Sequence, residues 1–168
     1  MTSNSGEVRR RPGAHRSVEG VHSRTAVKTA AKAVSIVFLL VGVLGFIPGI
    51  TTGYDTLTFA GHESEAMLLG VFQVSILHNI VHLLFGVVGW TVSRTVSGAR
   101  NFLIGGGIVY LVLTVYGWVI DKESAANVIP VNAADDWLHL LLGLGMIGLG
   151  FVLRPHPRDV QPGSGTVR

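Results

Sequence analysis

Four long stretches without a single Lys, Arg, Asp or Glu constrain the fold of this chain more than any other feature. They cover residues 33–52, 66–93, 101–120 and 137–153. A helix needs roughly 17–25 apolar residues to cross a hydrocarbon core ~30 Å thick. These stretches are apolar nearly all round, whereas a surface helix of a soluble protein keeps one polar face. We therefore predict an all-α membrane protein with a four-transmembrane-helix bundle, the last helix being extended to 135–153.

The remaining charges are sorted by sign along the chain. Twelve of the thirteen Lys and Arg residues lie in residues 1–32, 94–100 and 154–168. The other two connections, 53–65 and 121–136, each carry a net charge of −3. Positive residues stay on the cytoplasmic side of a membrane protein. We therefore expect a multi-pass protein of the cell (inner) membrane with both termini in the cytoplasm. The formal net charge of +3 reports topology, and no nucleic-acid partner is expected.

Both ends of the chain differ in composition from the apolar domain, residues 33–153. Residues 1–32 are rich in Ser, Arg and Gly, and we expect a basic, disordered cytoplasmic tail that can contact anionic lipid. Residues 154–168 are expected to form a second disordered cytoplasmic tail. The absence of cysteine excludes disulfides, cysteine-ligated zinc, iron–sulfur clusters and cysteine nucleophiles. The oligomeric state stays open.

An internal repeat relates the second predicted helix to the fourth. Shifted by 57 positions, residues 71–86 fall on 128–143 with six identities, among them His82 on His139. The first and third helices correspond more loosely, with Gly45 falling on Gly117. We predict two helical hairpins related by a pseudo-two-fold axis along the membrane normal. His82 and His139 would then lie at a similar depth and face one another.

Polar residues and glycines share one face of the second and of the fourth predicted helix. A face of this kind meets other helices rather than lipid. We expect an outer layer of His78, Asn79, Asp135 and Asp136, with His82 and His139 one turn deeper. Two further polar residues, Ser75 and Asn132, belong to the same cluster.

Several functions are open for this cluster. The side chains can simply hydrogen-bond across helices and cap the fourth helix, a structural role that we place first. Alternatively, a transition metal could bind to His78, His82 and His139 with Asp135 or Asp136. Haem could bind axially between His82 and His139. A membrane-embedded zinc hydrolase using Ser75 and a proton- or solute-handling protein are less favoured alternatives.

Three strings carry a resemblance to a known family: residues 42–49 (GVLGFIPG), 78–86 (HNIVHLLFG) and 132–139 (NAADDWLH). Together they resemble small bacterial four-helix membrane proteins that are classified only as a domain of unknown function, family 4383. The resemblance covers roughly residues 30–153. It implies an integral membrane protein and brings no activity, ligand or catalytic residue. The expectation is a small polytopic membrane protein of unknown activity, with no commitment to an enzyme.

Overall fold

The computed structural model describes residues 13–153, most of which form four α-helices. These are α1 (Gly13–Leu44), α2 (Ile76–Val92), α3 (Val96–Val119) and α4 (Ala133–Val152). The α1–α2 connection contains a 3-10 turn, η1 (Tyr54–Thr56), and a small sheet. Its strands are β1 (Thr51–Thr52), β2 (Met67–Leu68) and β3 (Phe72–Gln73), which pair antiparallel in that order.

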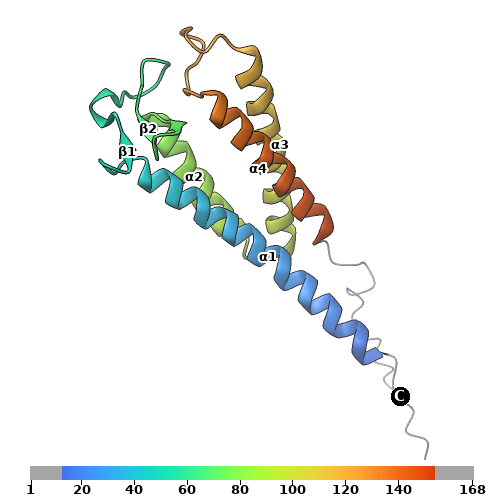
Figure 1. The fold of residues 1–168 in the computed structure, drawn as a ribbon. Coiled ribbons are helices and arrows are strands. Elements are labelled where there is room, and N and C mark those ends of the chain that lie inside the picture. Colours follow the sequence, from blue (N-terminus) through green and yellow to red (C-terminus); the bar gives the residue numbers. More distant parts are fainter. Residues whose placement is uncertain (1–12, 154–168) are drawn as a thin grey trace, which may run out of the picture.

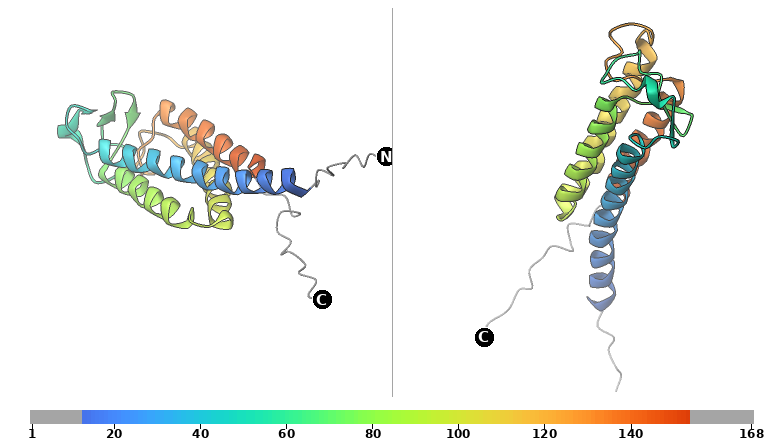
Figure 2. Two further views of the ribbon diagram at one scale, coloured as in Figure 1. Left: turned by 90° about the horizontal axis from the view of Figure 1, so that it is seen from below. Right: turned by 90° about the vertical axis from the view of Figure 1, so that its left-hand side faces the viewer.

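The helices pair into two hairpins. α1 packs mainly on α2, α3 packs mainly on α4, and α1 also packs against α3 (Figure 1). The two views in Figure 2 show the sheet and the α3–α4 loop together at one end of the bundle. The short α2–α3 connection lies at the opposite end, beyond which α1 projects. We call the first of these the sheet end.

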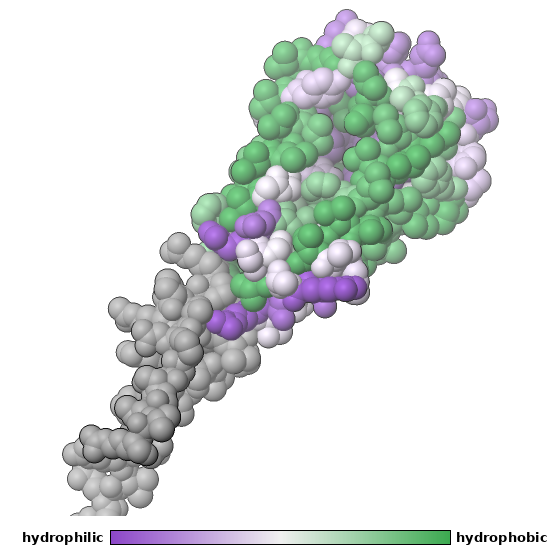
Figure 3. All heavy atoms as spheres, turned by 180° about the vertical axis from the view of Figure 1, so that it is seen from behind, coloured by the Kyte–Doolittle hydropathy of each residue, from purple (hydrophilic) through white to green (hydrophobic). Residues whose placement is uncertain are grey.

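Polar side chains face inward and apolar side chains face outward in the helical region. Leu84, Val112 and Leu141 are each at least 60% exposed, whereas Asn79 and Asp136 are buried. Figure 3 shows a broad hydrophobic surface with hydrophilic residues at both of its ends. Residues Arg24–Leu44 of α1, together with α3 and α4, are long and apolar enough to cross a membrane, whereas α2, with 17 residues, is shorter. The architecture is therefore all-helical, with three helices of membrane-spanning length within residues 13–153.

The predicted span 66–93 is wrong in its first ten residues, which form β2, a turn and β3 instead of helix. Leu69 and Gly70 have φ values of 55° and 69°, a left-handed conformation that a helix does not contain. The helix starts only after Ser75, whose hydroxyl accepts a hydrogen bond from the backbone N–H of His78. Hydropathy alone could not reveal this turn, because its residues are as apolar as those of the helix.

The predicted span 33–52 is displaced, because α1 begins at Gly13 and ends at Leu44. Residues 13–32, predicted to be disordered, are helical. Val27 and Ala31 are fully buried in one cluster with Phe102 and Leu103 of α3. Tertiary packing of this kind stabilises a helix that its own residues would form only marginally. The rest of the two predicted tails, residues 1–12 and 154–168, lies outside the described residues.

Candidate functional site

Three histidine side chains, which we call the histidine cluster, lie together inside the bundle. His78 and His82 occupy successive turns of α2, and His139 lies in the second turn of α4. The ring centroid of His78 is 4.6 Å from that of His82 and 6.4 Å from that of His139. Each side chain is less than 10% exposed. The i, i+4 spacing puts the first two on one face, and the packing of the two hairpins brings the third beside them.

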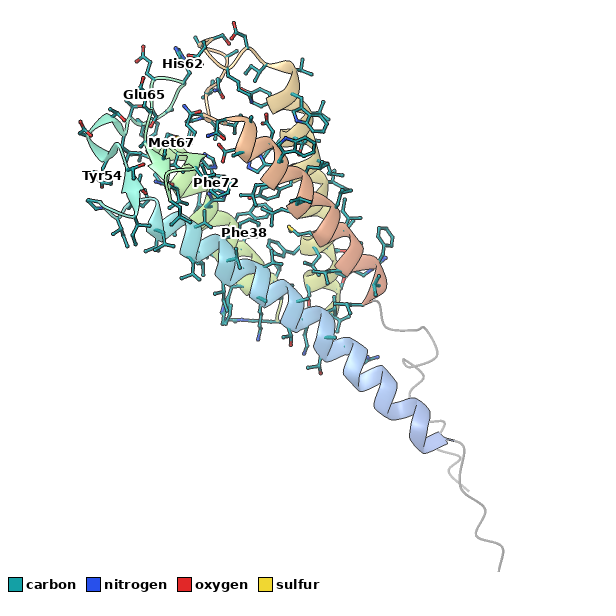
Figure 4. The ribbon with its side chains drawn as sticks, viewed as in Figure 1. Phe38, Tyr54, His62, Glu65, Met67 and Phe72 are labelled. Atoms are coloured by element: carbon teal, nitrogen blue, oxygen red, sulfur yellow. The ribbon has the colours of Figure 1, made fainter. Side chains whose placement is uncertain are left out.

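Two apolar cavities border the histidine cluster, and all three histidines line both of them. The larger cavity, of about 340 Å³, lies between α2, α3 and the segment before α4. The smaller, of about 240 Å³, lies between α1, the sheet and α4. Figure 4 labels two of its lining residues, Phe38 from α1 and Phe72 from β3. The remaining lining is mainly aliphatic and includes Leu77, Val81 and Leu113 in the larger cavity and Val41, Leu138 and Leu142 in the smaller.

The histidine rings differ in whether the protein satisfies their nitrogens. His78 Nδ1 lies 3.2 Å from the carbonyl oxygen of Pro130, so an Nδ1–H donates there and leaves Nε2 as an acceptor. Within residues 13–153, neither the His82 ring nor the His139 ring makes a hydrogen bond, and the Nδ1 atom of each is buried. A buried polar group without a partner costs about 1–3 kcal/mol. Two of the three rings therefore keep unused hydrogen-bonding capacity beside an apolar cavity.

An aromatic stack connects the two hairpins next to these rings. Phe38 of α1 stacks on His82 with centroids 6.0 Å apart, and on Tyr110 of α3 with centroids 5.4 Å apart. Tyr110 in turn meets His139 edge to face, at 5.1 Å. The Tyr110 hydroxyl makes no hydrogen bond within the described part of the chain, and Tyr110 lines the larger cavity. The stack places flat apolar faces beside the free histidine nitrogens.

Ser75, Asn132 and Asp135 act as helix caps. Asn132 Oδ1 accepts the Asp135 N–H at 3.0 Å, and Asp135 Oδ2 accepts the Asn132 N–H at 2.9 Å, which is a capping box. The same Oδ2 accepts the backbone N–H of Gln73 in β3 at 3.0 Å. Asp135 also lines the smaller cavity, whereas Ser75 lines neither cavity and its hydroxyl caps α2. A hydrolase that uses Ser75 as a nucleophile finds no support in this arrangement.

Asn79 and Asp136 lie in the contacts within each hairpin, so the expected outer layer of four polar side chains does not form. The side chain of Asn79 fills the space where Gly45 lacks a side chain, and Asp136 does the same at Gly117. Asp136 Oδ2 is paired with Lys122 Nζ at 2.7 Å. The stripe pattern could not separate a residue facing the hairpin partner from one facing the other hairpin, because both faces are buried.

The two hairpins make equivalent contacts at equivalent positions. With offsets of 72 residues from α1 to α3 and 57 from α2 to α4, each contact in the first hairpin has a counterpart in the second. The pairs are Phe38–His82 and Tyr110–His139, Gly45–Asn79 and Gly117–Asp136, and Gly86–Leu39 and Gly143–Leu111.

Contacts between the hairpins follow the same offset at the helix starts. His78 donates to the backbone carbonyl of Pro130, and Asp135 accepts from the backbone N–H of Gln73. Both the side chains and their backbone partners are 57 residues apart. The histidine and the carboxylate therefore perform the same task, each tying the start of its helix to the other repeat.

Sequence reasoning missed Phe38, Lys122 and the carbonyl of Pro130 as members of this region. The alignment of Gly45 with Gly117 contained the signal for the first, because the same offset places Phe38 on Tyr110. The expected metal ligands gain no support from the geometry. Within residues 13–153, no group of three or more His, Asp or Glu side chains is arranged so as to hold a metal ion.

Comparison with known proteins places the chain without assigning an activity to it. Residues 28–152 match the family model described as "Domain of unknown function (DUF4383)". This range contains α2, α3, α4, the sheet and the histidine cluster. No curated protein and no solved structure matches the sequence.

Proposed function

The chain belongs to the DUF4383 family of unknown function, and we propose that it is a four-span membrane protein that binds a small, mainly apolar molecule at its histidine cluster. The observation that carries the proposal is the combination of free ring nitrogens and apolar space. His82 and His139 are buried, lack hydrogen bonds within residues 13–153, and line both cavities. Ligand sites are largely apolar and contain a few polar groups that fix orientation.

The placement in the membrane follows from charge and length. At 1.5 Å per residue, the 17 residues of α2 extend about 25 Å, and the sheet continues the chain beyond its start. Lys28, Lys32 and Arg100 lie toward the end opposite to the sheet, whereas the acidic 53–65 and 121–136 segments join the helices at the sheet end. The positive-inside rule then puts the sheet end outside and both termini in the cytoplasm of a cell (inner) membrane protein.

A purely structural role accounts for part of the polar cluster. Ser75, Asn132 and Asp135 are caps, and Asn79 and Asp136 fill the contacts within the hairpins. His82 and His139 stand apart because their nitrogens stabilise nothing within the described residues. A structural role predicts that apolar rings at these two positions improve stability, whereas the binding role predicts that they abolish binding.

Haem is a second candidate occupant, because a histidine nitrogen from each hairpin is what axial ligation across a bundle requires. Reconstitution with haem followed by absorption spectroscopy separates the two candidates. A Soret band that is lost in both His82→Phe and His139→Phe would favour haem over an apolar organic molecule.

A binding experiment with 1-naphthol tests the proposal. This fluorescent molecule has an apolar body and a single hydroxyl. We expect saturable binding to the full chain in lipid nanodiscs above the partition measured in empty nanodiscs. Leu142→Phe adds volume to the smaller cavity and should weaken binding, whereas Leu141→Phe on the exposed side of α4 should leave it unchanged. Non-saturable uptake that equals partition into empty nanodiscs would overturn the proposal.

A further inference from the structure

The free histidine nitrogens occur as an equivalent pair, one from each hairpin. His82 and His139 are 57 residues apart, the offset that relates all the α2 and α4 contacts described above. Each ring lies against an equivalent aromatic ring, Phe38 or Tyr110, and these two rings stack on one another at 5.4 Å. An approximate two-fold axis therefore passes close to the Phe38–Tyr110 stack and relates the two free nitrogens.

We propose that the ligand is a flat aromatic ring with a polar oxygen at each of two opposite edges, the chemistry of a quinol or quinone. This inference rests on the proposed binding function and specifies its ligand. Two groups related by a two-fold axis present the same chemistry from opposite sides. A ligand that has two-fold symmetry itself satisfies both of them, whereas a molecule with one polar end leaves one ring unpartnered.

The chemistry of neutral histidine fits both forms of such a ligand. An imidazole without a protein partner can offer either an N–H or a lone pair, depending on its tautomer. It can therefore donate to a carbonyl or accept from a hydroxyl. His78 is not equivalent, because its Nδ1 is occupied by Pro130 and its repeat counterpart is Asp135.

The cavities suit the rest of the molecule. Phe38 and Tyr110 provide flat faces for an aromatic ring, which prefers offset or edge-to-face packing. The larger cavity lies beside α2 and α3, which pack on each other only slightly. Its aliphatic lining, including Val81 and Leu113, offers space for an apolar substituent on the ring.

Three planar compounds that share one ring system test this inference. They are 1,4-dihydroxynaphthalene kept reduced under argon, 1-naphthol and naphthalene, each titrated into the full chain in nanodiscs with empty nanodiscs as the reference. A hydrogen bond typically contributes about fivefold in affinity. We expect 1,4-dihydroxynaphthalene to bind about fivefold more tightly than 1-naphthol, and 1-naphthol about fivefold more tightly than naphthalene.

Substitution of either ring should have the same effect. In His82→Phe and in His139→Phe, the second hydroxyl should lose its advantage, so 1,4-dihydroxynaphthalene and 1-naphthol bind equally. Because a variant can fail to fold, the compound series on the unmodified protein also decides the question. Equal saturable binding of the diol and 1-naphthol would overturn the two-oxygen inference and leave the binding function standing. Failure of all three compounds to bind saturably would overturn the proposed function itself.

Discussion

Replacing Gly117 with alanine tests the contact that holds α3 on α4. A Cβ added at Gly117 would lie 2.7 Å from Asp136 Cγ and would overlap its Oδ1. Non-bonded carbon atoms prefer separations of about 3.5–4.0 Å, so Asp136 must move. Overpacking of this kind costs about 1–3 kcal/mol. Displacement of Asp136 also weakens its pair with Lys122 Nζ, which now stands at 2.7 Å. Since the Lys122 side chain is 31% exposed, only a fraction of a buried-pair penalty applies. We expect a total loss of about 2–4 kcal/mol.

The matched control is Gly105→Ala on the same helix. A Cβ at Gly105 meets nothing within 4 Å, and alanine favours a helix over glycine by up to ~1 kcal/mol. Unfolding in mixed micelles can be followed by tryptophan fluorescence, because Trp118 and Trp137 lie with ring centroids 5.8 Å apart across the α3–α4 contact. Gly117→Ala should unfold at a lower fraction of denaturing detergent than the wild type, and Gly105→Ala at an equal or higher one. Equal midpoints for the two variants would refute the reasoning.

Three further predictions concern the same region. Gly45→Ala should destabilise the α1–α2 hairpin by about 1–3 kcal/mol, because its Cβ would overlap the Asn79 side chain, whereas Gly145→Ala, with open space around it, should not; thermal unfolding in detergent checks this. Asn132→Ala removes the capping box of α4 and should cost about 1 kcal/mol in the same assay, against no loss for the exposed Glu123→Gln. Lys122→Met leaves the buried Asp136 carboxylate without its cation and should lower the unfolding midpoint; an unchanged midpoint would mean that the pair contributes nothing to stability.

The sequence was informative about helices wherever apolar residues continued without a turn. The predicted spans 101–120 and 135–153 overlap α3 and α4, whose ends are marked by the cap residues Thr95 and Asn132. It failed at 66–75, where an apolar run folds into two strands because Leu69 and Gly70 adopt left-handed backbone angles. It failed again before residue 33, where packing of Val27 and Ala31 on α3 decides the conformation. Both failures depend on contacts between residues distant in the sequence.

The candidate site was predictable to the extent that the repeat was visible. Aligning His82 with His139 identified two residues that share both cavities. A helical stripe could not assign each polar residue to a partner, since Asn79 and His82 lie on one broad face yet contact different elements. The cavities themselves could not be predicted, because empty space depends on how the two hairpins pack.

The ring nitrogens of His82 and His139 can be observed directly by solid-state ¹⁵N NMR of the full chain in lipid bilayers, assigned with single His→Phe variants. If the two rings bind the ligand, addition of 1-naphthol should shift the ¹⁵N resonances of at least one of them. His78 Nδ1, held by Pro130, should change little. Saturating 1-naphthol that leaves the ¹⁵N resonances of both His82 and His139 unchanged would contradict the account.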